Sequence, residues 1–504
     1  MLSSRAVRFL ALELVLCLIL LAFWWRLGLD DSYIFLTYAR NFAKSGIFAY
    51  NPGEPSYGFS SPAWVIILAA VSRVTMIPVG VFLSNLLGVI MCGLSALAAW
   101  SIWGETEQQP SSKGLLFASL LFSGPWFFTI WFIFGMETGF AVFSIFGFLL
   151  WLVKLRAGAT RFPWLILGAL SATALALTRL ESSIYIGCAI VFTLMTTRSK
   201  RQVADLLIVG VFAGGAEVAW LLYAHRLFGT YMPWTSTARI IYYLPYSFAG
   251  MTGDEFHHLS VGGHIMLALK AFFHIMFGGP MKFLLVVFPA CVALYLMRLK
   301  EKPASLRSML AIATLGMALE LGLFTFLFPL AQNRHLIPYI AGIWVLAAPA
   351  LAAMVERMAM PIRAAAFGAV VVLWVGGAAL YRQEGVSLEP LHQIAASGYL
   401  TANDQVGAEP IGIIAFETPA HIIDLGGLTD RDAWPLLMTT KKLTITDVVT
   451  WDLGKGATKL ILGKQDCLPS DHIYGNYCVA DAQRARELAR SARGVPMSPN
   501  SSAP

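Results

Sequence analysis

Two adjacent carboxylates, Asp30 and Asp31, follow directly on an apolar stretch that is long enough to cross a membrane. One of them could act as a general base on a hydroxyl group, and the other could bind an acceptor or a divalent cation. The alternative is structural, because Asp30, Asp31 or Ser32 could equally cap the helix expected over the residues that follow.

Further charged residues stand at the boundaries of other apolar runs. Glu137 lies in GMETG, Arg179 and Glu181 lie in LTRLES, and Arg334 and His335 lie in NRHLIP. Charges at such boundaries are costly, so each suggests a functional site, although each acid could simply pair with a basic residue for packing. Arginines that hold a phosphate leaving group, together with carboxylates, fit sugar transfer from a polyprenyl phosphate.

The composition explains why these boundaries exist. Of the 504 residues, 57% are hydrophobic and only 13% are charged, and the mean hydropathy is +0.67. Soluble proteins keep about a quarter of their residues charged, so the chain is predicted to be an all-α polytopic membrane protein. The net charge of +7 resides mostly in short basic loops, so nucleic acid is not expected as a partner.

The basic loops predict the orientation. They lie at residues 5–8, 154–161, 196–201, 298–307 and 356–363, and the positive-inside rule places them in the cytoplasm. The first apolar stretch is interpreted as an uncleaved anchor rather than a signal peptide. The expected location is a bacterial inner membrane, crossed many times, with the active site and the C-terminal domain on the periplasmic side.

Twelve apolar runs are visible, but a cytoplasmic N-terminus and an outer C-terminus require an odd number of crossings. One of the two runs in residues 62–103 is therefore expected to be a partial or re-entrant helix, which leaves about 11 transmembrane helices. Residues 1–381 are assigned to this transmembrane module, which includes an outer loop at residues 30–61.

The outer loop is predicted to begin with an amphipathic helix that lies in the membrane interface. Its polar stripe consists of Thr37, Arg40, Asn41 and Lys44, and Gly46 can end the helix. The segment NPGEPSYGFSSP that follows is expected to form turns before the chain re-enters the membrane.

From residue 382 the composition shifts to short β-branched runs mixed with glycine, aspartate and proline. KLTITDVVTW and TKLILGK are interpreted as strands, so residues 382–480 are predicted to form a small C-terminal α/β extracytoplasmic domain. A helical to disordered tail is expected at residues 481–504. Cys467 and Cys478 flank a polar loop and are a candidate disulfide if this domain lies outside the cytoplasm.

Two weaker patterns leave alternatives open. The histidines of GDEFHH match no standard zinc spacing, so a surface loop is preferred. Trp234, Tyr242, Tyr243 and Tyr246 make residues 225–280 rich in aromatic side chains. They could form an interface belt, the favoured interpretation, or a wall that stacks against sugars.

Residues 30–64, DDSYIFLTYARNFAKSGIFAYNPGEPSYGFSSPAW, resemble the first outer loop of the GT-C superfamily of membrane glycosyltransferases. They are most similar to the branch of mycobacterial cell-wall arabinofuranosyltransferases. GMETG, LTRLES, NRHLIP and IIDLGGLTD resemble later motifs of that branch, so the resemblance covers nearly the whole chain. The positions that match in the first loop are Asp30, Asp31, Ile34, Tyr38, Asn41, Tyr50, Asn51, Gly53, Glu54, Gly58, Ser60, Ser61 and Trp64.

The resemblance implies roles for Asp30, Asp31, Glu137, Arg179 and Arg334, and the roles of the other site residues are predictions made beside it. Asp30 would be the catalytic base with Asp31 beside it, and the donor phosphate would be bound by Arg179, Arg334 and His335. Glu137 and Glu181 would bind the acceptor or a metal. The loop would be supported by Tyr38, Arg40, Asn41, Tyr57 and Ser60. Leu180, Ser182, His335 and Tyr57 depart from the pattern and leave the donor and acceptor open.

The predicted function is the inverting transfer of a sugar from a polyprenyl-phosphate donor to a cell-envelope glycan, lipid or protein. The sugar would be a pentofuranose such as arabinofuranose, or a hexose. The main alternative is a transporter or flippase of lipid-linked sugars, which would more often show inverted repeats and mid-membrane polar residues. The expected partners are the lipid-linked sugar, the acceptor and membrane lipids, and the one cofactor considered is a divalent cation.

Overall fold

The computed structural model describes residues 3–23, 26, 29–112, 114–123, 129–159, 161–243, 245, 250–277, 280–326, 333–408, 410–441, 443–467 and 471–484. The chain divides into two compact units. The helical unit comprises Met1–Gly28, Ser60–Arg226 and Val261–Gln383, and the sheet unit comprises Leu29–Phe59, Leu227–Ser260 and Glu384–Pro504. The sequence predicts that residues 30–61 belong with the membrane helices, whereas in the structure Leu29–Phe59 group with the C-terminal residues.

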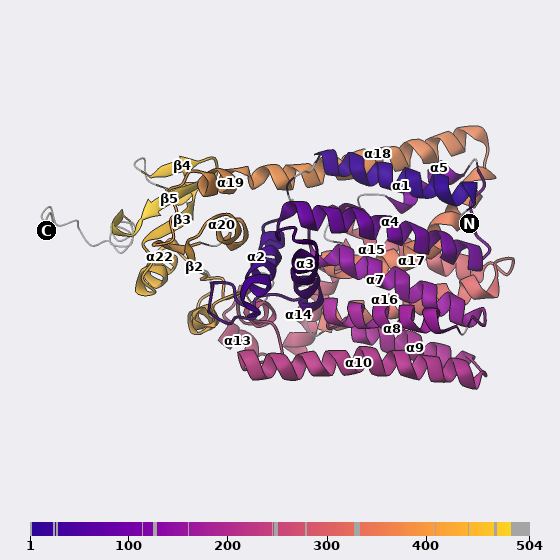
Figure 1. Ribbon diagram of the computed structural model, residues 1–504, viewed down its shortest axis with the longest axis horizontal. Coiled ribbons are helices and arrows are strands. Elements are labelled where there is room, and N and C mark those ends of the chain that lie inside the picture. The colour runs from indigo at the N-terminus through magenta and orange to yellow at the C-terminus, as the bar shows by residue number, and fades with distance from the viewer. Residues whose placement is uncertain are drawn as a thin grey trace, which may run out of the picture. The chain divides into compact units, whose positions relative to one another are not determined.

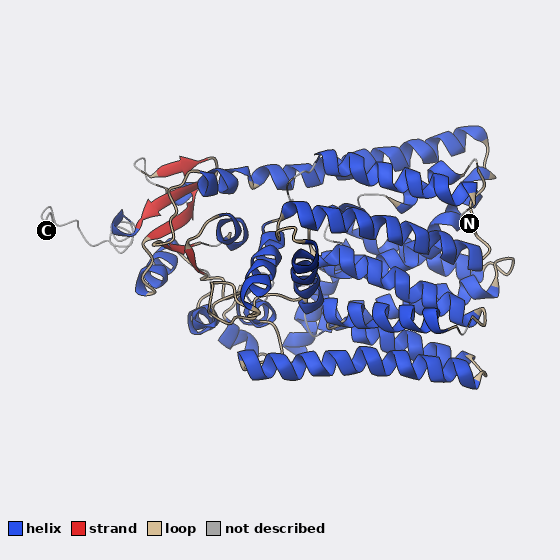
Figure 2. Cartoon of the chain, in the orientation of Figure 1, coloured by secondary structure: helices blue, strands red, loops and turns tan. Residues whose placement is uncertain are grey.

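Long helices that lie side by side build the helical unit (Figures 1 and 2). Its helices are α1 (Ser4–Phe23), α3 (Pro62–Thr75), α4 (Val81–Glu105), α5 (Leu115–Phe122), α6 (Thr129–Ile133), α7 (Glu137–Arg156), α8 (Phe162–Thr178), α9 (Ser182–Thr196), α10 (Lys200–Phe228), α14 (Val261–Phe277), α15 (Pro280–Arg298), α16 (Ala304–Phe326), α17 (Asn333–Glu356) and α18 (Met360–Ser387).

Within the described residues, six helices are long and apolar enough to cross a membrane, in α4, α7, α10, α16, α17 and α18. The apolar windows of α7 and α17 are each 89% buried, which makes these two helices the centre of the unit. The corresponding windows of α10 and α18 are only 22% and 6% buried. Such broad exposed apolar faces are suited to lipid, so the chain is a multi-pass membrane protein.

The region with the expected partial helix contains one short and one long helix. α3 has 14 residues, whereas α4 has 25 residues and qualifies as a span. At 1.5 Å per residue α3 is about 21 Å long, less than the ~30 Å thickness of a hydrocarbon core. The total of about 11 crossings stays a prediction.

A five-stranded mixed sheet forms the core of the sheet unit, with strand order β2-β1-β3-β5-β4. β1 pairs in parallel with β2 and β3, while β5 pairs antiparallel with β3 and β4. The strands are β1 (Gln405–Gly407), β2 (His421–Ile423), β3 (Lys459–Gly463), β4 (His472–Tyr474) and β5 (Tyr477–Asp481). The helices are α2 (Asp30–Ser45), α11 (Trp234–Ala238), η1 (Arg239–Tyr243), α13 (Gly253–His257), α19 (Glu389–Ala396), α20 (Ile411–Glu417), η2 (Arg431–Ala433), α21 (Trp434–Thr439), α22 (Ile445–Gly454) and η3 (Lys464–Asp466).

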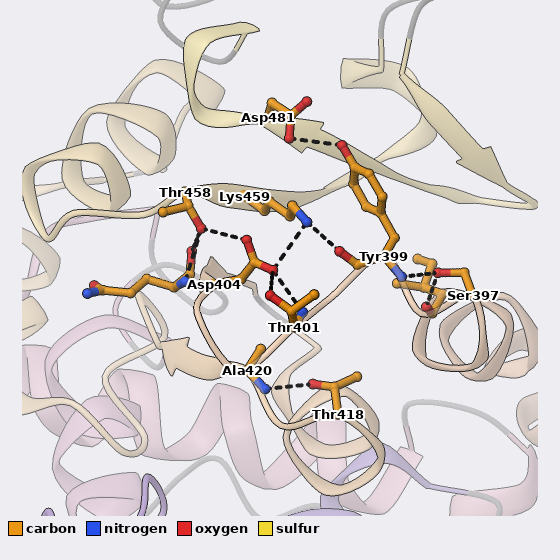
Figure 3. A network of polar contacts seen from close by, with 11 residues as sticks. Ser397, Tyr399, Thr401, Asp404, Thr418, Ala420, Thr458, Lys459 and Asp481 are labelled. Carbon is orange, nitrogen blue, oxygen red and sulfur yellow. Dashed lines mark hydrogen bonds and ion pairs between the residues drawn. The ribbon is translucent and has the colours of Figure 1, made fainter.

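Asp404 ties the strands of this sheet together (Figure 3). Its carboxylate accepts hydrogen bonds from Thr401 and Thr458 and pairs with Lys459 at 3.2 Å. Burial alone would raise the pKa of Asp404, but these partners outweigh burial and lower it to about 2. The residue therefore stays ionised and holds β1 to β3 at ordinary pH.

Of the two strands predicted from the sequence, one is confirmed and the other is a helix in the structure. TKLILGK contains β3, but most of KLTITDVVTW forms α22. Thr444 and Asp447 make a capping box at the start of α22, and this local signal outweighs the β-branched residues that follow. Cys467 and Cys478 form a disulfide. The expected tail at 481–504 lies outside the described residues beyond Arg484.

Candidate functional site

Asp30 is the first residue of α2, but it does not cap that helix. The cap position is occupied by Leu29, which makes no side-chain hydrogen bond, so the capping interpretation of Asp30 for its own helix is wrong. The two carboxylate oxygens of Asp30 instead accept hydrogen bonds from the backbone N–H groups of Gly412 and Ile413, both at 2.8 Å. These N–H groups belong to the first turn of α20, where carboxylates are stabilising.

Arg40 binds the other end of α20. Its guanidinium donates to the carbonyl oxygens of Phe416 at 2.6 Å and Ala415 at 3.1 Å. Carbonyls at a helix C-terminus lack internal partners and favour a cation, so both ends of α20 are satisfied by side chains of α2. Asp31 lies half-buried on the first turn of α2.

The environment of Asp30 favours a protonatable carboxyl group. Burial raises its pKa, the two backbone hydrogen bonds lower it, and the neighbouring charge of Asp31 raises it, so that the pKa is about 6. Each carboxylate oxygen has two lone pairs and uses one for a backbone amide. A second lone pair on each oxygen could therefore accept a proton from a hydroxyl group.

The expected exposed polar stripe of α2 is wrong for two of its four members. Thr37 and Asn41 are buried, as are all the other residues of α2 from Ser32 to Ala39. The Asn41 amide donates to the carbonyls of Ala49 and Tyr50 at 3.0 and 2.8 Å. Lys44 is exposed, and Gly46 ends the helix in the left-handed conformation, as expected.

Tyr38 and Tyr57 hold the loop that follows α2. The Tyr38 hydroxyl lies 2.9 Å from the Ser56 hydroxyl and accepts a hydrogen bond from the Gly58 N–H at 2.9 Å. The Tyr57 ring stacks on Phe228 with centroids 4.8 Å apart. Ser60 is half-buried at the start of the next helical-unit segment.

Gly58 lets this loop approach the turn of IIDLGGLTD. A Cβ atom at residue 58 would lie 2.6 Å from the Leu428 carbonyl oxygen and 2.7 Å from the Tyr38 hydroxyl. We expect Gly58→Ala to lower the free energy of unfolding by about 1–3 kcal/mol, because the loop or the turn must shift. Thermal unfolding of the purified protein checks this. Gly454→Ala is the matched control, since its Cβ would meet open space, and equal melting temperatures for the two variants would contradict the close approach.

A separate charged cluster lies in the helical unit and is centred on Arg179. This side chain is 2% exposed, and its guanidinium pairs with Glu137 at 2.9 Å. It also lies 3.6 Å from Glu181 and donates to the Thr138 hydroxyl at 3.3 Å. The sequence-predicted residues Glu137, Arg179 and Glu181 therefore come together. Within the described residues, Glu137 Oε2 is buried and has no hydrogen-bond partner, so a further donor could bind there.

Glu320 and Tyr339 extend this cluster and are not among the site residues that the sequence predicts. Glu320 is fully buried in α16 and accepts from the Tyr185 N–H at 3.3 Å. The Tyr339 hydroxyl lies 2.8 Å from the Ser182 hydroxyl. The sequence alone could have pointed to Glu320, because an acid within the apolar run MALELGLF costs free energy to bury and therefore suggests a function.

Arg334 and His335 lie in the first turn of α17, which begins at Asn333. His335 is 8% exposed and lies one turn before Tyr339, which places both on one face of the helix. Arg334 lies on the same helix, but its side chain is outside the described residues. Among the side chains that are described, no group of three or more His, Cys, Asp or Glu residues is placed to hold a metal ion.

No protein-family model matches the sequence, and no curated protein matches it. Among solved structures, the chain is similar to ArnT from Cupriavidus metallidurans bound to undecaprenyl phosphate, with a TM-score of 0.55 and 14% identity. The match covers 94% of this chain and 97% of ArnT. A second similar structure is the archaeal oligosaccharyltransferase AglB from Archaeoglobus fulgidus, in complex with an inhibitory peptide and a dolichol-phosphate. Its TM-score is 0.46 at 10% identity, over 90% of this chain and 69% of that one. The chain therefore shares the fold of ArnT.

Proposed function

We propose that the chain is a glycosyltransferase that moves a sugar from a polyprenyl-phosphate donor to an acceptor hydroxyl. The observation that carries the proposal is the buried Arg179–Glu137 pair, in a fold that binds undecaprenyl phosphate in ArnT. A buried guanidinium is suited to phosphate because it offers paired, charge-assisted hydrogen bonds. The contact of Arg179 with Glu181 is longer than a hydrogen bond, so a phosphate oxygen could replace that carboxylate.

In this proposal the acceptor oxygen attacks the anomeric carbon of the donor sugar, and the bond from that carbon to the phosphate oxygen breaks. The acceptor proton passes to Asp30, and the electron pair of the broken bond leaves with the polyprenyl phosphate. Arg179, joined by Arg334 and His335, stabilises the charge on the departing phosphate. One displacement without a covalent intermediate inverts the anomeric configuration.

Glu137 and Glu181 have a second role in the proposal, which is to bind acceptor hydroxyls or a divalent cation. The unsatisfied oxygen of Glu137 supports this assignment, because a buried carboxylate oxygen gains from a ligand donor. The sugar is proposed to be a pentofuranose such as arabinofuranose, or a hexose. The acceptor is a cell-envelope glycan, lipid or protein at the periplasmic face, and the membrane is a bacterial inner membrane.

The pH dependence of transfer tests the role of Asp30. Its pKa is about 6, raised above the ordinary value for Asp, so the carboxyl group is mostly protonated below that pH and cannot accept a proton. We expect transfer to fall about tenfold for each pH unit below about 6 and to level off above about pH 7. Release of polyprenyl phosphate from polyprenyl-phosphate arabinose or polyprenyl-phosphate mannose is the measurement. A rate that stays constant from pH 4.5 to 7.5 would contradict the assignment.

A further inference from the structure

A cavity of about 600 Å³ lies within the sheet unit, and the proposed reaction does not use it. Its lining comes from residues 50–56, from residues 227–234 and from residues 405–455. A volume of this size falls in the range of small-molecule sites. Chain segments that are distant in the sequence therefore build one open, mainly polar cavity.

The charges that line the cavity are largely compensated. Lys455 pairs with Asp430 at 3.4 Å and also contacts Asp432. The Arg431 guanidinium lies over the Trp234 ring, 5.8 Å from its centroid. Glu54 adds a third carboxylate, so acids outnumber the Lys and Arg cations in this lining. A phosphate or another anion would have to compete with these carboxylates, which favours a neutral ligand.

Trp234 brings a buried hydrogen-bond donor to the cavity lining. It is 7% exposed and lines the cavity, and its Nε1–H has no partner among the described residues. The neighbouring Trp434, at a centroid distance of 6.4 Å, instead donates its Nε1–H to the Gly427 carbonyl at 3.0 Å. A buried indole N–H without a partner costs free energy, so a ligand acceptor at Trp234 would recover it.

We propose that this cavity binds a neutral carbohydrate, and, resting on the proposed function, that this carbohydrate belongs to the acceptor. Sugar hydroxyls can donate to the carboxylates of Glu54, Asp430 and Asp432, and a sugar oxygen can accept from the Trp234 N–H. The indole is also a rigid apolar surface for the C–H groups of a sugar ring. Of the two interpretations of the aromatic segment at 225–280, the sugar-contacting one applies to Trp234.

Isothermal titration of the purified full chain with mannotriose and with an arabinofuranose trisaccharide tests the site. At least one of them should bind with a millimolar or tighter Kd. Trp234→Phe keeps the ring and removes the N–H, so we expect a Kd about 5- to 10-fold higher. Asp432→Asn should raise the Kd about tenfold. Asp466→Asn removes a charge from outside the cavity lining and should leave the Kd unchanged.

Three results would overturn the site: neither trisaccharide binds, binding is indifferent to both substitutions, or inorganic phosphate or calcium displaces the sugar. The Asp30→Asn protein should bind sugar normally, because Asp30 does not line the cavity. Sugar binding without transfer from any donor would reject the proposed function and leave the cavity assignment standing. Transfer with sugar binding that is insensitive to Trp234 would reject the cavity assignment alone.

Discussion

Replacing Asp30 by Asn is expected to lower sugar transfer by about 10²- to 10⁴-fold, the range that a positioned general base contributes. The asparagine cannot accept the acceptor proton. Its amide also presents N–H groups toward one of the two backbone donors of α20, which are bound by carboxylate oxygens in the native chain. We therefore expect an additional loss of about 1–3 kcal/mol in the free energy of unfolding.

Arg40→Met is the matched control for this prediction. It removes the hydrogen bonds to Ala415 and Phe416 and loosens the opposite end of α20 without changing a proposed base. The free energy of unfolding should fall by a similar amount, while transfer should stay within about tenfold of the native rate. Equal losses of transfer in the two variants would show that Asp30 acts only by holding α20.

Replacing Arg179 by Met is expected to have the largest effect on stability. Glu137 would be left buried without its cation, which costs about 3–5 kcal/mol. The double variant Glu137→Gln with Arg179→Met removes both charges, so most of the lost stability should return. Transfer should remain about 10²- to 10³-fold below native in the double variant, because the departing phosphate lacks its guanidinium.

The comparison of single and double variants separates packing from phosphate binding. Thermal unfolding measures what the Arg179–Glu137 ion pair contributes to stability, and release of polyprenyl phosphate measures sugar transfer. A double variant that regains both stability and transfer would mean that Arg179 and Glu137 only satisfy each other. A single Arg179→Met variant as stable as the native chain would contradict the buried ion pair itself.

The sequence predicts best those site residues whose charge lies within an apolar run, where burying a charge costs free energy. Glu137, Arg179 and Glu181 interrupt apolar runs, and the structure brings these three together. Glu320 could have been found by the same argument. The capping box of α22 could also be predicted from the sequence, because Thr444 and Asp447 stand three residues apart.

The contacts of α2 could not be predicted, because their partners lie far away in the sequence. Asp30 and Gly412 are separated by 382 positions, and nothing local indicates that α2 supports both ends of α20. The helical spacing of Thr37 and Asn41 is typical of an exposed stripe, but both side chains are buried. Helical periodicity identifies a face of a helix, but it does not tell which chain segment covers that face.

Proteoliposomes that contain the purified chain, a polyprenyl-phosphate sugar and a glycan acceptor test the central claim most directly. We predict release of one polyprenyl phosphate for each sugar transferred, with inversion of the anomeric configuration in the product as seen by nuclear magnetic resonance. Movement of the intact lipid-linked sugar between leaflets without any release would contradict the transferase and favour the flippase.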